Sequence, residues 1–157
     1  MKNRAIFLDI DGVLNNRSTT ETDGGIIGID SNNLQLFSQI VRQTNSLVIL
    51  SSSWRYGWER TEKSKQNQHG NYLDSKFESV SIQIDDKIDD MCRSRGEGIL
   101  DYLETHQNIT EWVVLDDVRH ASFFGNEIQG RFVKIDSETG FSEKDSNTIL
   151  KLFTKEK

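Results

Sequence analysis

Two aspartates that stand two residues apart, Asp9 and Asp11, are the strongest candidates for catalysis in this sequence. They follow a short apolar run, residues 5–8 (AIFL), and Gly12 comes directly after them. In an extended chain, side chains at positions i and i+2 point to the same side, so both carboxylates are expected to face one site. Gly12 permits the sharp change of direction that a chain needs as it leaves a strand. A carboxylate in such a place can act as a nucleophile, a general acid–base or a metal ligand.

Two further apolar runs also end in polar side chains. Residues 47–50 (LVIL) lead into Ser51, and residues 112–115 (WVVL) lead into Asp116 and Asp117. Continuous apolar runs of this length are typical of strands that are buried on both faces. Because ligands of parallel α/β sheets bind at the carboxyl ends of the strands, we expect these side chains to meet the two aspartates of the first strand at one edge.

Helical patterns lie between these runs. Residues 34–41, 99–103 and 149–153 each carry apolar residues three or four positions apart, and Asp30 can cap the first of these helices. A weaker apolar run at residues 132–135 predicts a fourth strand. Strands that alternate with helices predict an α/β fold, here a three-layer, Rossmann-like parallel sheet with helices on both faces.

Two polar stretches fit this alternation poorly. Residues 15–29 contain three glycines and predict a loop or small hairpin that acts as a flap. Residues 56–90 predict a small insertion with one alternating strand candidate, residues 80–84 (VSIQI). Neither stretch is long enough for a large second domain, so we expect a single domain over residues 1–157 with a minimal cap or none.

The composition of this chain of 157 residues excludes several classes of protein. The formal net charge of −6 disfavours general nucleic-acid binding, because non-specific affinity comes from Lys and Arg residues that neutralise phosphates. The single cysteine, Cys92, excludes an internal disulfide and a cysteine-rich zinc site. The three histidines have no metal-ligand spacing and are expected at the surface. No apolar run approaches the about 20 residues that span a membrane, and nothing resembles a signal peptide, so we expect a cytoplasmic protein.

The segment DIDGVL, residues 9–14, resembles the DxDG[TV] signature of the haloacid dehalogenase-like (HAD) superfamily. Ser51 at the end of its strand is similar to the second motif of that superfamily, and the pair Asp116–Asp117 is similar to the fourth. Residues 51–55 (SSSWR) and residues 95–103 look most like the HAD domains of Swiss Army Knife RNA repair proteins. The resemblance extends over residues 4–117 and implies the HAD-like fold.

The resemblance implies a phosphatase with a defined role for each residue. Asp9 would attack phosphorus and form an aspartyl-phosphate, and Asp11 would protonate the departing alcohol and later take a proton from water. Ser51, or Ser52 in its place, would hydrogen-bond a phosphoryl oxygen. Mg²⁺ is the implied cofactor, held by Asp9, Asp11 through its backbone carbonyl, Asp116, and Asp117 as a ligand or as the neighbour of one.

The third motif of the superfamily is where this sequence departs from the pattern. A lysine usually balances the charge of the nucleophile and phosphate, but the segment before the third strand offers Arg93 and Arg95. Arg95 is the better candidate because it leads into a helical segment, and Lys87 is the remaining alternative. Arginine carries the same charge in a fork that suits phosphate.

Substrate contacts are expected beside the strand ends, from Gly12, Ser52 and Arg55, the last by gripping a phosphate. The three aromatic residues between positions 54 and 58 could stack on a nucleobase. Core packing is the more frequent role of such residues, and we expect it for at least one of them.

These inferences predict a Mg²⁺-dependent phosphatase that hydrolyses a phosphomonoester. The substrate is expected to be a phosphorylated small molecule, a nucleotide or a nucleic-acid end; an open site suits bulky substrates, whereas the net charge favours a small one. Two alternatives stay open: a catalytically inactive HAD-like partner subunit, which the missing lysine allows, and a phospho-accepting, Mg²⁺-binding signalling domain. Asp11 disfavours the second alternative, since receiver domains lack this acid–base. The sequence does not predict the oligomeric state.

Overall fold

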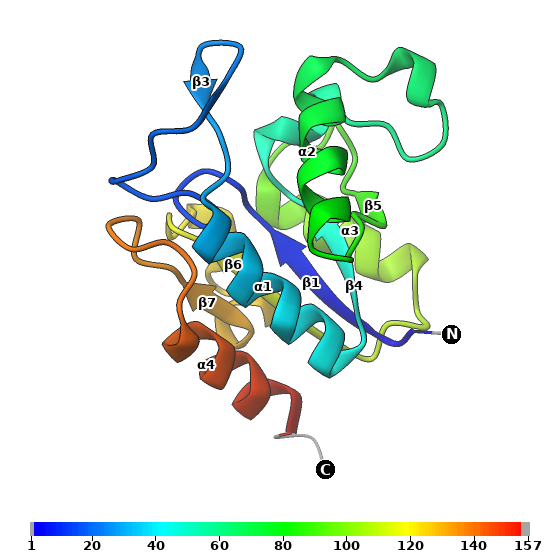
Figure 1. The fold of residues 1–157 in the computed structure, drawn as a ribbon. Coiled ribbons are helices and arrows are strands. Elements are labelled where there is room, and N and C mark those ends of the chain that lie inside the picture. The colour runs from blue at the N-terminus through cyan, green and yellow to red at the C-terminus, as the bar shows by residue number, and fades with distance from the viewer. Residues whose placement is uncertain (1, 155–157) are drawn as a thin grey trace.

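A five-stranded parallel sheet forms the centre of the molecule in the computed structural model, which describes residues 2–154 (Figure 1). Residue 1 and residues 155–157 of the expected domain lie outside the described residues. The strands are β1 (Arg4–Leu8), β4 (Ser46–Leu50), β5 (Asp86–Lys87), β6 (Glu111–Asp116) and β7 (Phe132–Lys134). They lie in the order β5–β4–β1–β6–β7, and every neighbouring pair is parallel.

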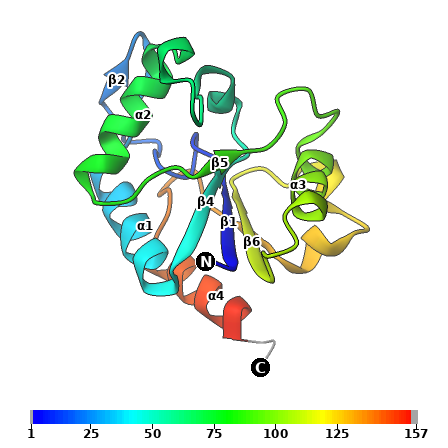
Figure 2. The same ribbon diagram turned by 90° about the vertical axis from the view of Figure 1, so that its right-hand side faces the viewer.

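Helices cover both faces of this sheet (Figure 2). The α-helices within residues 2–154 are α1 (Ser31–Thr44), α2 (Gln68–Ser79), α3 (Arg95–Thr105) and α4 (Glu143–Thr154). Alternate side chains of β1 build two separate cores: Ile6 and Leu8 pack with α1, α2 and α4, whereas Ala5 and Phe7 pack with α3. The predicted three-layer α/β fold is therefore confirmed. None of the described helices is long and apolar enough to cross a membrane.

The segment after β1 forms a small antiparallel hairpin of β2 (Thr22–Asp23) and β3 (Ile26–Ile27), as the glycine-rich sequence predicts. This hairpin is tied to α2. The Nδ1 atom of His69 lies 2.7 Å from Asp23 Oδ2, and the backbone N–H of Ile29 donates to Tyr72 Oη at 2.8 Å. The hairpin and α2 therefore lie side by side.

Helix α2 was not predicted, because its apolar face is narrow. Leu73 and Phe77 are its buried large apolar residues, and the rest of the helix is mostly polar. The signal that could have found it is its first turn: Asn67 accepts hydrogen bonds from two backbone N–H groups of the helix.

The strand predicted at residues 80–84 is wrong. Ser81 adopts a left-handed conformation with φ of 62°, and the N–H of Ile82 donates to the carbonyl of Phe77. This arrangement ends helix α2, so the first residues of the alternating pattern serve as a helix cap and not as a strand. The short strand β5 follows instead, where the chain pairs with β4.

Candidate active site

The ends of the three central strands are level with one another. Leu8, the last residue of β1, pairs with the last apolar residue of β4 and of β6. The residues that follow these three positions are Asp9, Ser51 and Asp116, so the sheet brings the predicted side chains to one edge. The backbone N–H groups of Asp9 and Ser51 continue the ladder, because they donate to carbonyls of the neighbouring strands at 3.1 and 3.0 Å.

Three carboxylates meet at this edge. Asp9, Asp116 and Asp117 each offer an oxygen that lies within 4.8 Å of the others. Asp116 is fully buried, Asp9 is 6% exposed, and Asp117 is partly buried. Burial raises the pKa of Asp9 well above its ordinary value, and the negative charge of Asp116 raises it further. The pKa of Asp117 is also raised, chiefly by burial. The protein thus concentrates negative charge where a cation would relieve it.

Arg95 is the basic residue that reaches this cluster. Its Nη1 atom lies 3.2 Å from Asp9 Oδ1 and donates to Asp116 Oδ2 at 2.7 Å. Ser94 caps α3 and so places Arg95 in the first turn of the helix, beside the strand ends. Arg93 precedes the helix and is exposed. Lys87 instead donates to the backbone carbonyls of Arg55 and Trp58. Of the three basic candidates, Arg95 is the one that contacts Asp9 in the described chain.

Gly12 makes the sharp turn after Asp11. Its φ of +81° favours glycine, and a Cβ atom at this position would lie 2.3 Å from Asp117 Oδ2. The turn therefore brings the chain against the acidic pair of β6. The N–H of Gly12 donates to Asn15 Oδ1 at 2.8 Å, so this amide shapes the turn. Direct contact between Gly12 and a substrate stays a prediction.

Asp11 lies in different surroundings from Asp9. It is exposed, and both of its carboxylate oxygens accept hydrogen bonds from uncharged donors. The Nδ2 atom of Asn15 donates to Oδ1 at 3.1 Å, and the indole Nε1 of Trp54 donates to Oδ2 at 3.3 Å. The same Asn15 amide donates to the carbonyl of Gly28 at the base of the hairpin. These contacts fix the direction of the Asp11 carboxylate.

The two serine candidates differ in what their hydroxyls do. Ser52 Oγ caps the following 3₁₀ turn, η1 (Ser53–Gly57), by accepting from the N–H of Trp54 at 3.2 Å. Ser51 Oγ is buried and has no hydrogen-bond partner among the described residues. A buried hydroxyl without a partner is costly unless a ligand supplies one, so Ser51 is the better candidate for a phosphoryl oxygen.

Arg55 faces inward, unlike the phosphate contact expected for it. The turn η1 folds the guanidinium back onto the chain, where it is 5% exposed. It donates to the carbonyls of Ser51 and Ser52 at 3.3 and 3.1 Å, and to the hydroxyl of Tyr56 at 3.1 Å. Arg55 therefore supports the turn that carries the serines.

The three aromatic residues of this turn have three different environments. Trp58 is 1% exposed and donates to Asp74 Oδ1, so it packs in the core as we expect for at least one of them. The ring of Trp54 packs against His69 and Tyr72. Tyr56 is 59% exposed.

Two residues of the site were missed by sequence reasoning. Asn15 is buried and holds Asp11, and its position four residues after Asp11 was the available signal. His120 was expected at the surface, but its Nε2 atom lies 3.2 Å from Asp116 Oδ2 and its ring packs against Phe123. No local pattern indicated this contact, because residues 117–120 form an irregular segment after β6.

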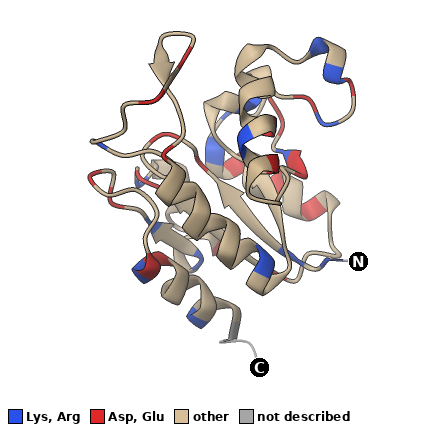
Figure 3. Ribbon diagram, in the orientation of Figure 1, with Lys and Arg blue, Asp and Glu red and all other residues tan. Residues whose placement is uncertain are grey.

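A cleft of about 550 Å³ opens beside Asp11, between the hairpin and η1. Ile26 and Ile27 of the hairpin form one part of its lining, and Trp54 and Tyr56 form another. The hairpin strands carry one charged residue, Asp23. Basic residues are found instead on the loop before α2, which carries Arg60, Lys63 and Lys65 (Figure 3).

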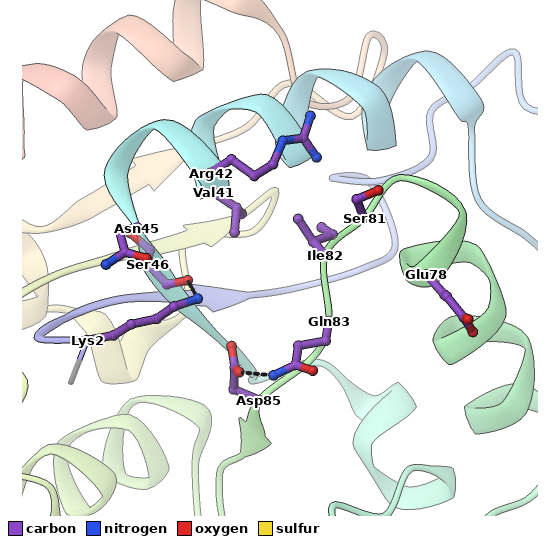
Figure 4. A pocket seen from close by; sticks show the side chains of 10 residues that line it. All are labelled: Lys2, Val41, Arg42, Asn45, Ser46, Glu78, Ser81, Ile82, Gln83 and Asp85. Atoms are coloured by element: carbon purple, nitrogen blue, oxygen red, sulfur yellow. Dashed lines mark hydrogen bonds between the residues drawn. The ribbon is translucent and has the colours of Figure 1, made fainter.

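A second cavity, of about 500 Å³, lies at the opposite end of β4 (Figure 4). Ser46, the first residue of β4, is part of its lining, together with Lys2, Arg42 and Asp85. Ser51 follows the other end of the same strand. None of the predicted site residues lines this cavity.

The comparisons with known proteins agree with this geometry. The family described as HAD domain in Swiss Army Knife RNA repair proteins matches residues 5–146. Neither the comparison with curated proteins nor the comparison with solved structures gives a match. The matched range contains every residue of the site described above and the whole sheet except Arg4, the first residue of β1. HAD membership points to a hydrolase of the phosphatase type. The chain belongs to the family of HAD domains found in Swiss Army Knife RNA repair proteins.

Proposed function

We propose that this chain is a Mg²⁺-dependent phosphatase that hydrolyses a phosphomonoester through an aspartyl-phosphate on Asp9. The observation that carries the proposal is the environment of Asp9. Its carboxylate stands buried at a strand end, against the guanidinium of Arg95 and beside two further carboxylates. A nucleophile toward phosphate needs such counter-charge, because two anions must approach each other.

The donor set fits Mg²⁺. This cation prefers oxygen ligands and usually keeps several waters, and Asp9, Asp116 and Asp117 offer carboxylate oxygens close together. The backbone carbonyl of Asp11 is the further ligand that we propose. The raised pKa of Asp9 supports the fit, since its causes, first burial and then the charge of Asp116, are ones that a bound cation would offset. When bound, Mg²⁺ would offset the charge of the carboxylates and of the phosphate.

The first half of the reaction transfers the phosphoryl group to the protein. A carboxylate oxygen of Asp9 forms a bond to phosphorus, and the bond between phosphorus and the leaving oxygen breaks. Asp11 gives its proton to that oxygen, so the product leaves as an alcohol. Arg95 balances the charge of Asp9 and of the phosphoryl oxygens, and Ser51 Oγ donates a hydrogen bond to one of them.

The second half returns the protein to its starting state. Asp11, now a carboxylate, takes a proton from a water molecule while the water oxygen attacks phosphorus. The bond between Asp9 and phosphorus breaks, and inorganic phosphate leaves. Asp11 ends with the proton that the next turnover needs, so the cycle consumes one water and one phosphomonoester.

Arg95 also favours this function over an inactive partner subunit. The departure from the family lysine is the observation behind that alternative, but an arginine stands where the missing charge is needed. A signalling domain that keeps its phosphate is disfavoured by Asp11, which is held in place by Asn15 and Trp54 as an acid–base would be.

The test is phosphate release from a panel of phosphomonoesters, with Mg²⁺ or with EDTA, for the wild type and for Asp9→Asn. The panel contains p-nitrophenyl phosphate, mononucleotides, ribose 5-phosphate and a 3′-phosphorylated oligonucleotide. We expect release that requires Mg²⁺ and is lost in Asp9→Asn. Release by Asp9→Asn at the wild-type rate would refute the proposal, as would the absence of release from every substrate while Mg²⁺ binds.

A further inference from the structure

In the mechanism proposed above, the leaving group of the substrate would lie in the cleft beside Asp11. Asp11 is itself part of the cleft lining, and it is the residue that we propose protonates the leaving oxygen. The phosphoryl group sits on the other side of that oxygen, toward Asp9. Whatever is attached to the leaving oxygen therefore extends into the space between the hairpin and η1. Its volume of about 550 Å³ is in the range of small-molecule binding sites.

Apolar surface is concentrated in this cleft. Six large apolar side chains are exposed in the described chain, and three of them line it: Ile26 at 40%, Ile27 at 52% and Tyr56 at 59%. Scattered exposed apolar residues are ordinary, but three around one cavity beside a catalytic group indicate a binding surface. The two isoleucines belong to the hairpin and Tyr56 to η1, so the surface comes from two separate segments.

Tyr56 is held in a fixed orientation although it is exposed. The guanidinium carbon of Arg55 lies 4.5 Å from the centre of its ring, and Arg55 Nη2 donates to its hydroxyl at 3.1 Å. Arg55 is itself buried and anchored on two backbone carbonyls. With one face on the guanidinium, the ring keeps its other face for a ligand. A pre-oriented aromatic ring is a stacking platform for flat groups, because less conformational entropy is lost on binding.

The charge of the lining selects against an anionic leaving group. The residues that line the cleft include no Lys or Arg, and Asp11 is acidic. The one ring that could gain a positive charge, His69, has its Nδ1 atom 2.7 Å from Asp23 Oδ2. A sugar bisphosphate or a polyphosphate chain would find no counter-charge here. The cleft suits a leaving group that is flat and uncharged, and Ser53 and Asn67 add polar groups for its edge.

We propose that this cleft binds the nucleobase of a nucleoside whose sugar hydroxyl carries the scissile phosphate, with the base stacked on Tyr56 and covered by Ile26 and Ile27. A nucleobase has apolar faces and a polar edge and is uncharged at neutral pH, which matches the lining on each count. The proposal rests on the phosphatase function proposed above and names the substrate class of that site.

The kinetic test compares a nucleoside monophosphate with ribose 5-phosphate, which has the same kind of phosphoester but no base. For the wild type we expect a kcat/KM that is higher for the nucleotide by about tenfold or more, the size of one stacking contact. Tyr56→Ala should lower the ratio of the two kcat/KM values by about tenfold, and Tyr56→Phe should keep it. Phe124→Ala removes another exposed aromatic residue, which does not line the cleft, and should leave both substrates unaffected. Equal kcat/KM values in the wild type would overturn the proposal.

A binding test separates this proposal from the phosphatase proposal. The free nucleoside has no phosphate and needs no metal, so calorimetry can measure its binding to Asp9→Asn, which is not expected to turn over. We expect saturable binding that Tyr56→Ala weakens about tenfold and that ribose alone does not show. Nucleoside binding without phosphate release by the wild type would sink the phosphatase function and keep the cleft assignment. Phosphate release by the wild type without nucleoside binding would overturn the cleft assignment and keep the phosphatase function.

The same base can belong to a free nucleotide or to the last nucleotide of a nucleic acid. A 3′-mononucleotide and a 3′-phosphorylated oligonucleotide distinguish these sources. The absence of Lys and Arg from the lining predicts that the added phosphates of the oligonucleotide raise kcat/KM by less than about threefold. A loss in Tyr56→Ala for both substrates supports a base from either source, and a loss for one assigns the base to that source. No loss for either contradicts the proposal.

Discussion

Asp9 and Asp11 are two residues apart, yet they stand in opposite kinds of surroundings. Asp9 is buried among charges, with Arg95, Asp116 and Asp117 around it. Asp11 is exposed at the mouth of an apolar cleft, and an amide and an indole N–H, both uncharged, hold its oxygens. In the proposed mechanism, one strand end thus separates the part of the site that would handle the phosphate from the part that would face the leaving group.

This difference explains how two identical side chains can have different tasks. Burial and Asp116 raise the pKa of Asp9, and a bound Mg²⁺ would offset this effect and favour the ionised carboxylate that attacks. At Asp11, two uncharged donors fix the direction of the carboxyl group beside the cleft, where it would face the leaving group. Gly12 fixes the path of the chain directly after Asp11, because its left-handed turn packs the backbone against Asp117.

The largest effect is expected for Asp9→Asn, which removes the nucleophile and keeps the size of the side chain. We expect kcat to fall by at least about 10⁴-fold, in line with the loss of nucleophiles in other covalent mechanisms. Steady-state phosphate release with saturating Mg²⁺ measures it, and circular dichroism shows whether the variant is folded. If the folded variant loses less than tenfold in kcat, Asp9 is not the nucleophile, and the proposed difference in role between Asp9 and Asp11 is wrong.

Asp11→Asn should cost less, and the cost should depend on the leaving group. General acid–base catalysis contributes about 10²–10⁴-fold, so we expect a fall of this size in kcat for an alkyl phosphomonoester. With p-nitrophenyl phosphate, whose leaving group needs no proton, the first step should keep nearly its full rate. Burst kinetics after rapid mixing measures that step. An equal loss in the first step for both kinds of leaving group would show that Asp11 is not the acid.

Arg95 tests the charged side of the comparison. Arg95→Ala removes the counter-charge of Asp9, and we expect kcat/KM to fall by about 10²-fold, as for other groups that stabilise transition-state charge. Arg95→Lys should recover part of that loss, because lysine restores the charge without the fork. The matched control is Arg93→Ala, which changes an exposed neighbour and should have no effect on kcat/KM.

The smallest effect concerns stability without metal. The pKa of Asp9 is raised in the folded protein, so its contribution to stability is present below the unfolded pKa and is lost as the pH rises through the folded value. In EDTA at pH 8 we therefore expect Asp9→Asn to melt higher than the wild type by about 3 °C, which corresponds to about 1 kcal/mol in a domain of this size. At pH 4 the difference should be smaller.

With Mg²⁺ we expect the wild type to melt higher than Asp9→Asn, because the cation binds the ionised carboxylates of the wild type. Differential scanning fluorimetry with and without Mg²⁺ measures both parts. A wild type that melts higher than Asp9→Asn in EDTA at pH 8 would speak against a repulsive carboxylate cluster.

The sequence was sufficient to predict the strands that carry the site and the residues that follow them. The apolar runs before Asp9, Ser51 and Asp116 are continuous, and parallel strands place such ends together. Helix α2 and strand β5 could not be predicted in this way, since one has a narrow apolar face and the other has two polar residues. Both depend on contacts with segments that are distant in the sequence.

The surroundings of each site residue were harder to predict than the site itself. The inward turn of Arg55 depends on the backbone of η1, and the contact of His120 with Asp116 depends on the path of the chain after β6. The cleft combines the hairpin with η1, which are about 30 residues apart in the sequence. A sequence pattern describes one segment at a time. It therefore identified candidate residues but not the cleft that forms between two segments.

The most direct test of the central claim is to trap the phosphoryl group on Asp9. Asp11→Asn is mixed with p-nitrophenyl phosphate and Mg²⁺, quenched in acid, digested and analysed by mass spectrometry. Since the first step survives in this variant and the second is slowed, we predict one added phosphoryl group on the peptide that contains Asp9, and none in the double variant Asp9→Asn/Asp11→Asn. A burst of p-nitrophenol with no phosphorylated peptide, or with the phosphoryl group on another residue, would contradict the assignment of Asp9 as the nucleophile.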